Sequence, residues 1–546
     1  MWNPVVLVIL DGWGIAPKGP GNAIALAKTP SIDALMTAFP HSKLEASGES
    51  VGLPHGEDGN TETGHLNIGA GRIVYQDLPR INMAIADGSF FTNHEFAAAI
   101  DHAKKFNSNL HLLGLVGAGG VHSNIEHLFA LIQTAKIHNF SRVFLHLITD
   151  GRDSPPSSAL TYIQQVKQHI ATTGIGTIAT VMGRYWAMDR DQRWDRTAKA
   201  YFALTKGQGE VVGSAEEAVQ RSYEKHVTDE FIDPSIIVSS DGHPLARIQD
   251  NDALIFFNFR IDRPRQLSRV FLFKNFAEAS SGWGFDPYSV KYHGTHLTGG
   301  EQTLQAPFDR GESLKNLYFV TMTKYGAGLE DAGSHPAFPP MPVEHPLGEV
   351  ISEKGLSQLR IAETEKERFV TFYFNGQREE PFPQEDRIII PSQRVATYDL
   401  RPEMSTHELA DVLVDRITNG TYAFIVANVA CPDMVAHTGN LDATIVACEA
   451  ADRLVGRVLD ATLARNGALV VSADHGNAEE LINPVTHGKD TEHSTFPVPL
   501  VIANSEFKGQ ARELAPGILA DIAPTILDLM GIPKPDTMTG RSLISI

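Results

Sequence analysis

Val5-Val6-Leu7-Val8-Ile9-Leu10, near the start of the 546-residue chain, runs directly into Asp11-Gly12. This unbroken apolar run predicts a strand buried on both faces, because a strand with one wet face would alternate apolar and polar residues. Similar runs, separated by segments of helix length, recur at 109–116, 142–148, 175–181, 253–257, 370–374, 422–429 and 468–471. The pattern predicts an α/β protein whose mostly parallel sheets are flanked by helices.

The segment 441–466 shows the helical half of this pattern. One face of that helix would collect the apolar residues Ile445, Cys448, Val455 and Leu459. Gly467 follows as a stop signal. This placement predicts that Cys448 lies in the core. The other cysteine, Cys431, lacks the neighbouring residues of a thiolate nucleophile and is also expected to be structural.

The charge balance is acidic: 46 lysines and arginines against 65 aspartates and glutamates give a net charge of −19. Such a surface repels nucleic acid and anionic lipid, so neither is an expected partner. Two cysteines are too few for a disulfide framework and fit a reducing compartment. No apolar run reaches the length of a membrane span, and the N-terminus lacks a signal-peptide pattern. We therefore expect a cytoplasmic protein that contacts no membrane, and we expect it to be a monomer.

Two polar, proline-containing stretches, 75–79 and 307–311, lie where the type of motif changes along the chain. They predict two domains, with the middle one inserted into the outer one. The outer domain would comprise residues 1–76 and 312–546, and the inserted domain residues 77–311. Residues 333–346 contain five prolines and are expected to form an irregular loop.

Acidic and histidine residues follow the first and the last predicted strands, namely Asp11, Asp433, His437, Asp474, His475 and His493. Asp433 and His437 are four residues apart, so on a helix they would project from the same face. Residues at the carboxyl ends of strands in an open α/β sheet share one crevice. Mixed carboxylates and imidazoles suit Mn²⁺, Zn²⁺, Co²⁺ or Fe²⁺, and the whole set predicts a two-metal centre. Any one of these residues alone could equally be a helix cap or a hydrogen-bonded core residue.

Residues 59–72 form a segment rich in glycine and small polar residues that contains Thr61. Glycine allows backbone N–H groups to approach an anion, and a threonine hydroxyl beside a divalent metal can act as a nucleophile. On its own the segment would be an ordinary turn. Beside the predicted metal centre, Thr61 becomes a candidate nucleophile.

In the inserted domain, arginines and other polar residues come directly after predicted strands. The candidates for a binding site are His122, Arg152, Asp153, Arg184, Arg190, Arg260 and Arg263. Guanidinium groups match phosphate and carboxylate in a bidentate manner, so a small polyanionic metabolite is the expected ligand. His122 and Asp153 could transfer protons there, or could be turn and cap residues. Surface salt bridges are the alternative, and Arg193, Arg196 and Arg265 could form these.

Taken together, these motifs closely resemble those of the 2,3-bisphosphoglycerate-independent phosphoglycerate mutases, members of the alkaline phosphatase superfamily. The resemblance covers nearly the whole chain. It rests on Leu10-Asp11-Gly12-Trp13-Gly14, on His493 and on the segments 64–72, 149–153, 183–190, 258–263, 362–366, 432–439 and 473–479. It implies a metal-binding domain of the alkaline phosphatase type with an inserted phosphotransferase domain that binds the substrate.

The resemblance further implies an isomerase of glycolysis and gluconeogenesis that interconverts 3-phosphoglycerate and 2-phosphoglycerate through a phosphoenzyme. It implies two Mn²⁺ ions, with Co²⁺ or Zn²⁺ as possible substitutes, and no 2,3-bisphosphoglycerate. The ligands of one ion are matched by Asp433, His437 and His493. Those of the other, which also contacts the nucleophile Thr61, are matched by Asp11, Asp474 and His475. The substrate-binding residues are matched by His122, Arg152, Asp153, Arg184, Arg190, Arg260, Arg263 and Lys366.

Within this resemblance, the reaction would depend on Thr61, Asp153 and Lys366. Thr61 would receive the phosphoryl group, Asp153 would exchange protons with the glycerate hydroxyls, and Lys366 would offset charge. Two stretches depart from the family pattern. Thr61 stands in the place of the usual serine, and its extra methyl group restricts χ1. Glu367-Arg368-Phe369 stands where the family often has an aromatic residue and a histidine.

Three alternatives stay open at this point. A phosphomonoester or sulfate-ester hydrolase would use the same metal centre, with water discharging Thr61, but would give the arginines no task. A phosphopentomutase fits the segments 149–153 and 183–190 less well. A non-catalytic protein would bind metal without taking up phosphate. Retention of glycerate during transfer favours closure of one domain on the other, with hinges near 75–79 and 307–311.

Overall fold

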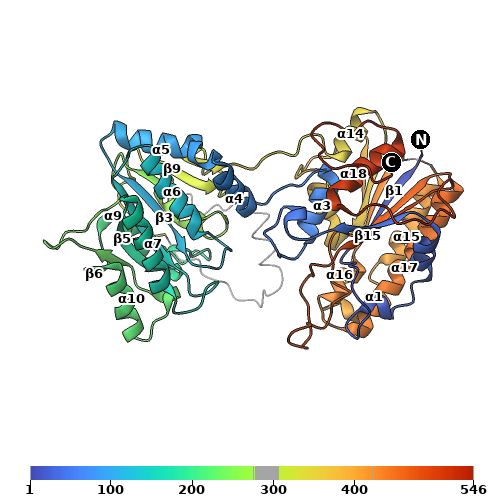
Figure 1. Cartoon of the computed structure of the whole chain (residues 1–546), viewed down its shortest axis with the longest axis horizontal. Coiled ribbons are helices and arrows are strands. Elements are labelled where there is room, and N and C mark those ends of the chain that lie inside the picture. Colours follow the sequence, from blue (N-terminus) through green and yellow to red (C-terminus); the bar gives the residue numbers. More distant parts are fainter. Residues whose placement is uncertain (1, 275, 277–306, 421, 545–546) are drawn as a thin grey trace. The chain divides into compact units, whose positions relative to one another are not determined.

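The computed structural model of the chain describes residues 2–274, 276, 307–420 and 422–544. It divides the chain into two compact units, drawn in Figure 1. The first unit consists of Met1–Pro79 and Met341–Ile546, and the second of Arg80–Pro340, so the second is inserted into the first. Each unit is built around a largely parallel sheet with helices packed on it, which confirms the predicted α/β class.

The sheet of the first unit has eight strands in the order β12-β11-β13-β1-β14-β15-β2-β16. Neighbouring strands pair in parallel except for β15, which is antiparallel to both β14 and β2. The strands are β1 (Val5–Leu10), β2 (His41–Glu45), β11 (Gln358–Glu363), β12 (Glu385–Ile390), β13 (Phe424–Val429), β14 (Ala468–Ser472), β15 (Val498–Ala503) and β16 (Gly517–Ile518).

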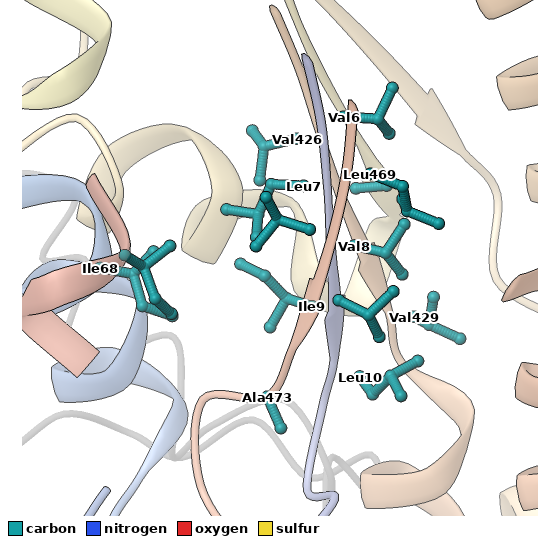
Figure 2. Packing of buried hydrophobic residues seen from close by; sticks show 14 of the residues in the cluster. Val6, Leu7, Val8, Ile9, Leu10, Ile68, Val426, Val429, Leu469 and Ala473 are labelled. Atoms are coloured by element: carbon teal, nitrogen blue, oxygen red, sulfur yellow. The ribbon is translucent and has the colours of Figure 1, made fainter. Parts of the chain in front are cut away.

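Strand β1 lies between β13 and β14, and each of its residues is buried. In Figure 2, Leu7 and Ile9 point to the face of the sheet on which Ile68 lies. Val8, between them, points to the opposite face. This two-sided burial explains why the run contains no polar residue before Asp11, as the sequence predicted.

Helices cover both faces of this sheet (Figure 1). One set consists of α1 (Ala23–Leu26), α2 (Pro30–Ala38), α15 (Thr406–Thr418), α16 (Cys431–Ala436) and α17 (Leu441–Ala464). The other consists of α3 (Thr61–Ala70), α14 (Leu347–Glu353) and α18 (Ile522–Met530). α17 confirms the helix predicted from 441, and both cysteines are buried, as expected. Within the described ranges, no helix is both long enough and apolar enough to span a membrane.

Within the described part of the second unit, the sheet also has eight strands, in the order β10-β9-β8-β3-β4-β5-β7-β6. Of the strand pairs in this described sheet, β5–β7 is antiparallel and the others are parallel. The strands are β3 (Leu110–Val116), β4 (Val143–Thr149), β5 (Thr177–Gly183), β6 (Glu210–Val212), β7 (Ser235–Ile237), β8 (Ala253–Phe256), β9 (Tyr318–Thr323) and β10 (Ser334–Phe338). Its helices include α5 (His94–Lys105), α6 (Ile125–Ile137), α7 (Ala159–Thr173), α8 (Arg184–Ala187), α9 (Trp194–Lys206), α10 (Ala215–Glu224) and α11 (Pro264–Leu272), and α4 (Asp77–Asp87) crosses the boundary between the units.

The predicted strands are confirmed to within a few residues, with one exception. Residues 370–374 were predicted as a strand, but they lie in a π-helical turn, Phe369–Tyr373, and its continuation. The strand of this region is β11, which ends at Glu363. A short apolar run fits a buried helical turn as well as a buried strand, so periodicity alone could not separate the two.

The chain returns to the first unit at Pro340–Met341, beyond the 307–311 stretch that the sequence favoured. The reason is that β9 pairs with β8, and β10 with β9, which extends the second sheet. The irregular loop expected for residues 333–346 is therefore wrong where β10 lies. Pro336 is tolerated there because β10 is an edge strand.

Among the described residues of the second unit, the histidines His111, His127 and His146 are fully buried. His127 Nε2 lies 2.9 Å from Asn82 Oδ1, and His146 lies 2.9 Å from both His111 and Thr180. Burial lowers the pKa of His127 to about 3. Burial, with a smaller contribution from His111, holds the pKa of His146 well below its usual range. Below about pH 6.5 the unfolded chain therefore binds more protons than the folded unit does.

We expect the second unit to lose stability as the pH falls below about 6.5, by up to ~1.4 kcal/mol per pH unit for each histidine. Unfolding releases each ring to take up a proton. In His127→Gln, whose amide can still donate to Asn82, the loss should be smaller. The loss of stability is measured by the urea-unfolding midpoints at pH 7 and pH 5, with unfolding of the second unit detected by proteolytic cleavage within it. Equal losses in the native and variant proteins would contradict the assignment.

Candidate functional site

Helix α3 begins at Thr61 and is capped by Asn60, whose side chain accepts a hydrogen bond from the Thr63 N–H at 2.9 Å. The cap fixes Thr61 in the first turn, where it is 6% exposed. Gly64 allows α3 to approach the loop after β14, because a Cβ at this position would lie 2.5 Å from the Asp474 carbonyl oxygen. The glycine-rich segment thus brings Thr61 against that loop.

The Thr61 hydroxyl faces the acidic and histidine residues. Thr61 Oγ1 lies 2.9 Å from His475 Nε2 and 3.4 Å from Asp11 Oδ1. It also lies 3.2 Å from Lys366 Nζ. The nearby Thr63 hydroxyl donates within its own turn instead. Thr61 is therefore the hydroxyl of this turn that can take part in chemistry at the cluster.

Asp11, Asp474 and His475 surround Thr61, and together these four residues form what we term the inner group. His475 Nε2 lies 3.4 Å from Asp11 Oδ1 and 3.5 Å from Asp474 Oδ2. All three residues are fully buried. Asp474 Oδ2 is buried, and its nearest partners are His65 Nδ1 at 3.2 Å and His475 Nε2. A buried carboxylate is costly without compensating positive charge or hydrogen bonds, and a bound cation would supply such charge.

Asp433, His437 and His493 form a second cluster, which we term the outer group. His437 Nε2 lies 3.3 Å from Asp433 Oδ1, and His493 Nε2 lies 3.5 Å from the same oxygen. The two Nε2 atoms are 3.1 Å apart. Asp433 lies in α16 and His437 directly follows it, so both project from one face, as their spacing predicted.

The histidines of both groups turn Nε2 toward the carboxylates because Nδ1 lies against a backbone carbonyl oxygen. The distances from Nδ1 are 2.8 Å for His437 to Thr491, 2.9 Å for His493 to Gly59 and 3.1 Å for His475 to Gly476. A carbonyl oxygen only accepts, so each Nδ1 donates and Nε2 is the atom left for a metal ion. Imidazole nitrogens and carboxylate oxygens in this arrangement fit two divalent ions such as Mn²⁺, Co²⁺ or Zn²⁺.

Positive charge offsets the buried carboxylates. Lys366 Nζ lies 2.8 Å from Asp11 Oδ1 and 2.7 Å from Asp433 Oδ2. Burial opposes its charge, but the carboxylates outweigh burial and raise the pKa of Lys366. Burial acts in the opposite direction on Asp433, but Lys366 holds its pKa well below the usual range. Burial likewise opposes the charge of His475, but Asp474 and the other carboxylates raise its pKa to about 10. Metal binding would therefore displace a proton there.

The structure thus brings all the predicted ligands together. Two sets of potential ligand atoms lie within 4.8 Å of one another: Asp433, His475 and His493, and Asp11, His65 and Asp474. His65 was missed by the sequence analysis. Its spacing of four residues from Thr61 would have placed it on the same face of α3. Asn428 and Asn477, which donate to Asp11 and Asp433, carried no such signal.

In the second unit, the loop after β4 meets Arg184 at the start of α8. Arg184 Nη1 donates to both Asp150 and Asp153. Asp150 also accepts from the Asp153 N–H at 3.1 Å and from Ser154 Oγ at 2.8 Å. Asp150, which was not among the predicted residues, therefore fixes this loop and Arg184 together.

Asp262 contacts several other residues of the same cluster. It accepts from Arg190 Nη1 at 2.7 Å and lies 3.4 Å from Arg260 Nε. Its other contact is His122 Nδ1, at 3.6 Å, while His122 Nε2 lies 3.7 Å from Asp153 Oδ2. The predicted residues His122, Asp153, Arg184, Arg190 and Arg260 are therefore close together.

Arg263 joins this cluster and Arg152 does not. Arg263 Nη1 donates to the Met188 carbonyl at 3.2 Å, and burial, reinforced by Arg184 and Arg190, lowers its pKa to about 10. Arg152 is half exposed and lies 3.8 Å from Glu230 Oε1. It follows β4 as predicted, but its side chain is directed to a different partner.

The positive charges of this cluster suit an anionic ligand, and the ionised Asp153 can accept a proton. Burial, which dominates, and the surrounding arginines lower the pKa of His122 to about 4, so it is neutral at neutral pH. Burial would raise the pKa of Asp153, but Arg184 lowers it below its usual value, so Asp153 is ionised. Buried atoms without a hydrogen bond among the described residues include His122 Nδ1, Arg184 Nε, Asp262 Oδ1 and Arg263 Nε.

Two known protein families match parts of this chain. A family described as sulfatase matches residues 288–532. A family described as the BPG-independent PGAM N-terminus matches residues 81–327. The sulfatase family is part of the alkaline phosphatase superfamily, so its match relates residues 288–532 to that superfamily.

Individual relatives narrow this class to one family. The chain is 52% identical to the 2,3-bisphosphoglycerate-independent phosphoglycerate mutase of Chloroflexus aurantiacus, over 99% of this chain and 98% of that one. It is 47% identical to the enzyme of that name from Moorella thermoacetica, with the same coverage. It is also similar to a crystal structure of Leishmania mexicana phosphoglycerate mutase at low cobalt concentration, with a TM-score of 0.58 and 28% identity over 100% of this chain and 98% of that chain. The chain therefore belongs to the 2,3-bisphosphoglycerate-independent phosphoglycerate mutases and is an isomerase of that family.

We expect Lys366→Met to destabilise the metal-free chain by about 3–5 kcal/mol, because it leaves buried Asp11 and Asp433 without their cationic partner. Added Mn²⁺ should restore much of the loss, since ion binding to the folded state stabilises it. Urea unfolding in chelator and in Mn²⁺ measures both effects.

Arg368→Met is the matched control, because Arg368 is exposed and pairs with Glu379 at the surface. It should change the stability by no more than ~1 kcal/mol in either condition. A Lys366→Met protein as stable in chelator as the native chain would contradict the charge compensation.

Proposed function

We propose that the chain interconverts 3-phosphoglycerate and 2-phosphoglycerate through a phosphothreonine at Thr61. The observation that carries this proposal is the position of Thr61 Oγ1, within 3.4 Å of Asp11, His475 and Lys366. A hydroxyl at the first turn of a helix, beside a metal-ligating cluster and a lysine, is arranged for nucleophilic attack on phosphorus.

The inner and outer groups would hold two Mn²⁺ ions, with Co²⁺ or Zn²⁺ as substitutes, and 2,3-bisphosphoglycerate would not be needed. The inner ion would be held by Asp11, Thr61, Asp474 and His475, and the outer ion by Asp433, His437 and His493. Bound ions would polarise the phosphoryl oxygens and favour ionisation of the Thr61 hydroxyl. The metal-free geometry supports this because Nε2 of each histidine already faces the carboxylates.

The chain's own residues would divide the remaining tasks. Thr61 Oγ1 bonds to phosphorus as the ester bond to glycerate breaks, and the proton that Thr61 loses matches the one that the glycerate oxygen gains. The other glycerate hydroxyl then attacks phosphorus as the bond to Thr61 Oγ1 breaks, and it gives its proton to Asp153, which is ionised in the folded chain. Asp153 afterwards releases a proton and the freed Thr61 oxygen regains one, so both residues return to their starting states. Lys366 would offset negative charge on the transferred group.

Substrate binding would fall to the second unit. His122, Asp153, Arg184, Arg190, Arg260 and Arg263 lie in one cluster, where buried donors such as Arg184 Nε and Arg263 Nε have no hydrogen bond among the described residues. We also include in the binding set Arg152 of the same unit and Lys366 of the first unit. Guanidinium groups would hold the carboxylate and phosphate of phosphoglycerate, and would retain glycerate by its carboxylate while the phosphoryl group is on Thr61. Retention of glycerate is what separates a mutase from a hydrolase built on the same metal centre. The first unit would thus be the phosphatase-like metal domain and the second the phosphotransferase domain.

We further propose that the enzyme works in the cytoplasm as a monomer, without nucleic-acid or membrane partners. The net charge of −19 and the two buried, unpaired cysteines support this proposal.

Phosphorus NMR of the purified chain with 3-phosphoglycerate and Mn²⁺, without bisphosphoglycerate, tests the function. We expect conversion to 2-phosphoglycerate that stops on chelation. Thr61→Ser should stay active, because it keeps the hydroxyl, and Thr61→Val should lose at least about 10³-fold in rate because it has no nucleophile.

Thr63→Val is the matched control, since it removes a buried hydroxyl of the same turn that does not face the cluster. It should keep the activity. Release of inorganic phosphate instead of 2-phosphoglycerate would identify a hydrolase, and metal binding without any conversion would identify a non-catalytic protein.

A further inference from the structure

Two fully buried side chains, His65 and Asn428, lie behind the inner group. His65 is in α3, one turn after Thr61, and Asn428 is the penultimate residue of β13. Neither has a role in the reaction proposed above. His65 lies near enough to Asp11 and Asp474 to be considered a third ligand beside them. Their hydrogen bonds decide between that possibility and a positioning role.

The orientation of Asn428 is fixed by Asp11. Asn428 Nδ2 lies 2.6 Å from Asp11 Oδ2, and a carboxylate oxygen accepts hydrogen bonds. The amide nitrogen must therefore face Asp11. The same nitrogen lies 3.1 Å from His65 Nε2, so its second hydrogen is available to that ring atom.

The tautomer of His65 follows from both of its ring contacts. His65 Nδ1 lies 3.0 Å from the Thr61 carbonyl oxygen, which accepts, so Nδ1 carries the proton. His65 Nε2 faces the Asn428 amide and accepts from it. Nδ1 also lies 3.2 Å from Asp474 Oδ2. Both ring nitrogens are thus engaged, and neither lone pair is directed at a metal ion.

One line of contacts therefore runs from Asp11 through Asn428 and His65 to the Thr61 carbonyl and the Asp474 carboxylate. We propose that His65 and Asn428 are positioning residues that fix these three members of the inner group, and that His65 does not bind metal. Hydrogen bonds behind metal ligands orient them and typically change metal affinity by about 10–100-fold. The proposal rests on the ion binding described under the proposed function.

The outer group has a comparable but separate support. Asn477 Nδ2 donates to Asp433 Oδ1 at 2.8 Å and is itself buried. The two amides therefore serve different clusters: Asn428 contacts Asp11, and Asn477 contacts Asp433. This separation supplies a matched variant, because removal of either amide leaves the other contact in place.

Isothermal titration of the full chain with Mn²⁺ tests the proposal. The titration uses a His493→Ala background, because the outer group then lacks one ligand and the measured affinity is that of the inner ion. Adding Asn428→Leu should lower the affinity for that ion about 10–100-fold. Adding Asn477→Leu should leave its affinity within about twofold, because Asn477 acts on the other cluster. Asn67→Leu controls for the loss of a buried amide, since the hydrogen bonds of the Asn67 side chain within the described residues join it to backbone groups of Val51, Thr63 and Val74.

The outcomes separate the two proposals. If the His493→Ala chain binds no Mn²⁺, the ion binding of the proposed function fails. If it binds Mn²⁺ and Asn428→Leu changes the affinity no more than Asn67→Leu does, the positioning role fails and the proposed function stands.

Neutron diffraction from metal-free crystals of the native chain keeps the proposal testable even if a variant does not fold. We expect one deuteron on His65 Nδ1, none on Nε2, and both amide deuterons of Asn428 directed at Asp11 and His65. A deuteron on His65 Nε2, or an Asn428 oxygen facing Asp11, would overturn the assignment.

Discussion

Three buried carboxylates, those of Asp11, Asp433 and Asp474, follow the adjacent strands β1, β13 and β14. Isolated charges cannot be buried without partners, because the desolvation cost far exceeds the stability of a domain. Neighbouring positive charges offset the desolvation cost of these carboxylates. Lys366 supplies positive charge between Asp11 and Asp433, and His475 is drawn toward its protonated form. The same need for positive charge supports the proposal that this site binds divalent metal.

In the second unit, positive charges lie close together and require negatively charged partners. Several arginines converge at the ends of β5 and β8, and aspartates hold them apart before any substrate arrives: Asp262 contacts Arg190 and Arg260, and Asp150 contacts Arg184. Their carboxylates orient guanidinium groups that would otherwise repel one another. An anionic ligand would then meet donors that are already in place, which lowers the entropic cost of binding.

The sequence could predict that these side chains lie close together, because parallel strands end at the same edge of a sheet and residues such as Asp11 and Asp474 follow neighbouring strands. It could not predict Asn428 or the tautomer of His65, since these depend on which atoms face each other after folding. The strand predicted at 370–374 failed because a short apolar run fits a buried π-helical turn equally well. The second crossing was misplaced because edge strand β10 contains a proline and reads as a loop.

The proposal that depends most on the local geometry is that Thr61 carries the phosphoryl group. Its methyl group restricts the hydroxyl to fewer rotamers, and the observed rotamer directs Oγ1 at His475 and Lys366. The most direct measurement is acid quenching of the Mn²⁺-loaded chain during turnover of 3-phosphoglycerate, followed by mass spectrometry of its peptides. The account predicts phosphate on Thr61 in the native chain and on the serine in Thr61→Ser. Turnover with phosphate on another residue, or on none at any quench time, would contradict it.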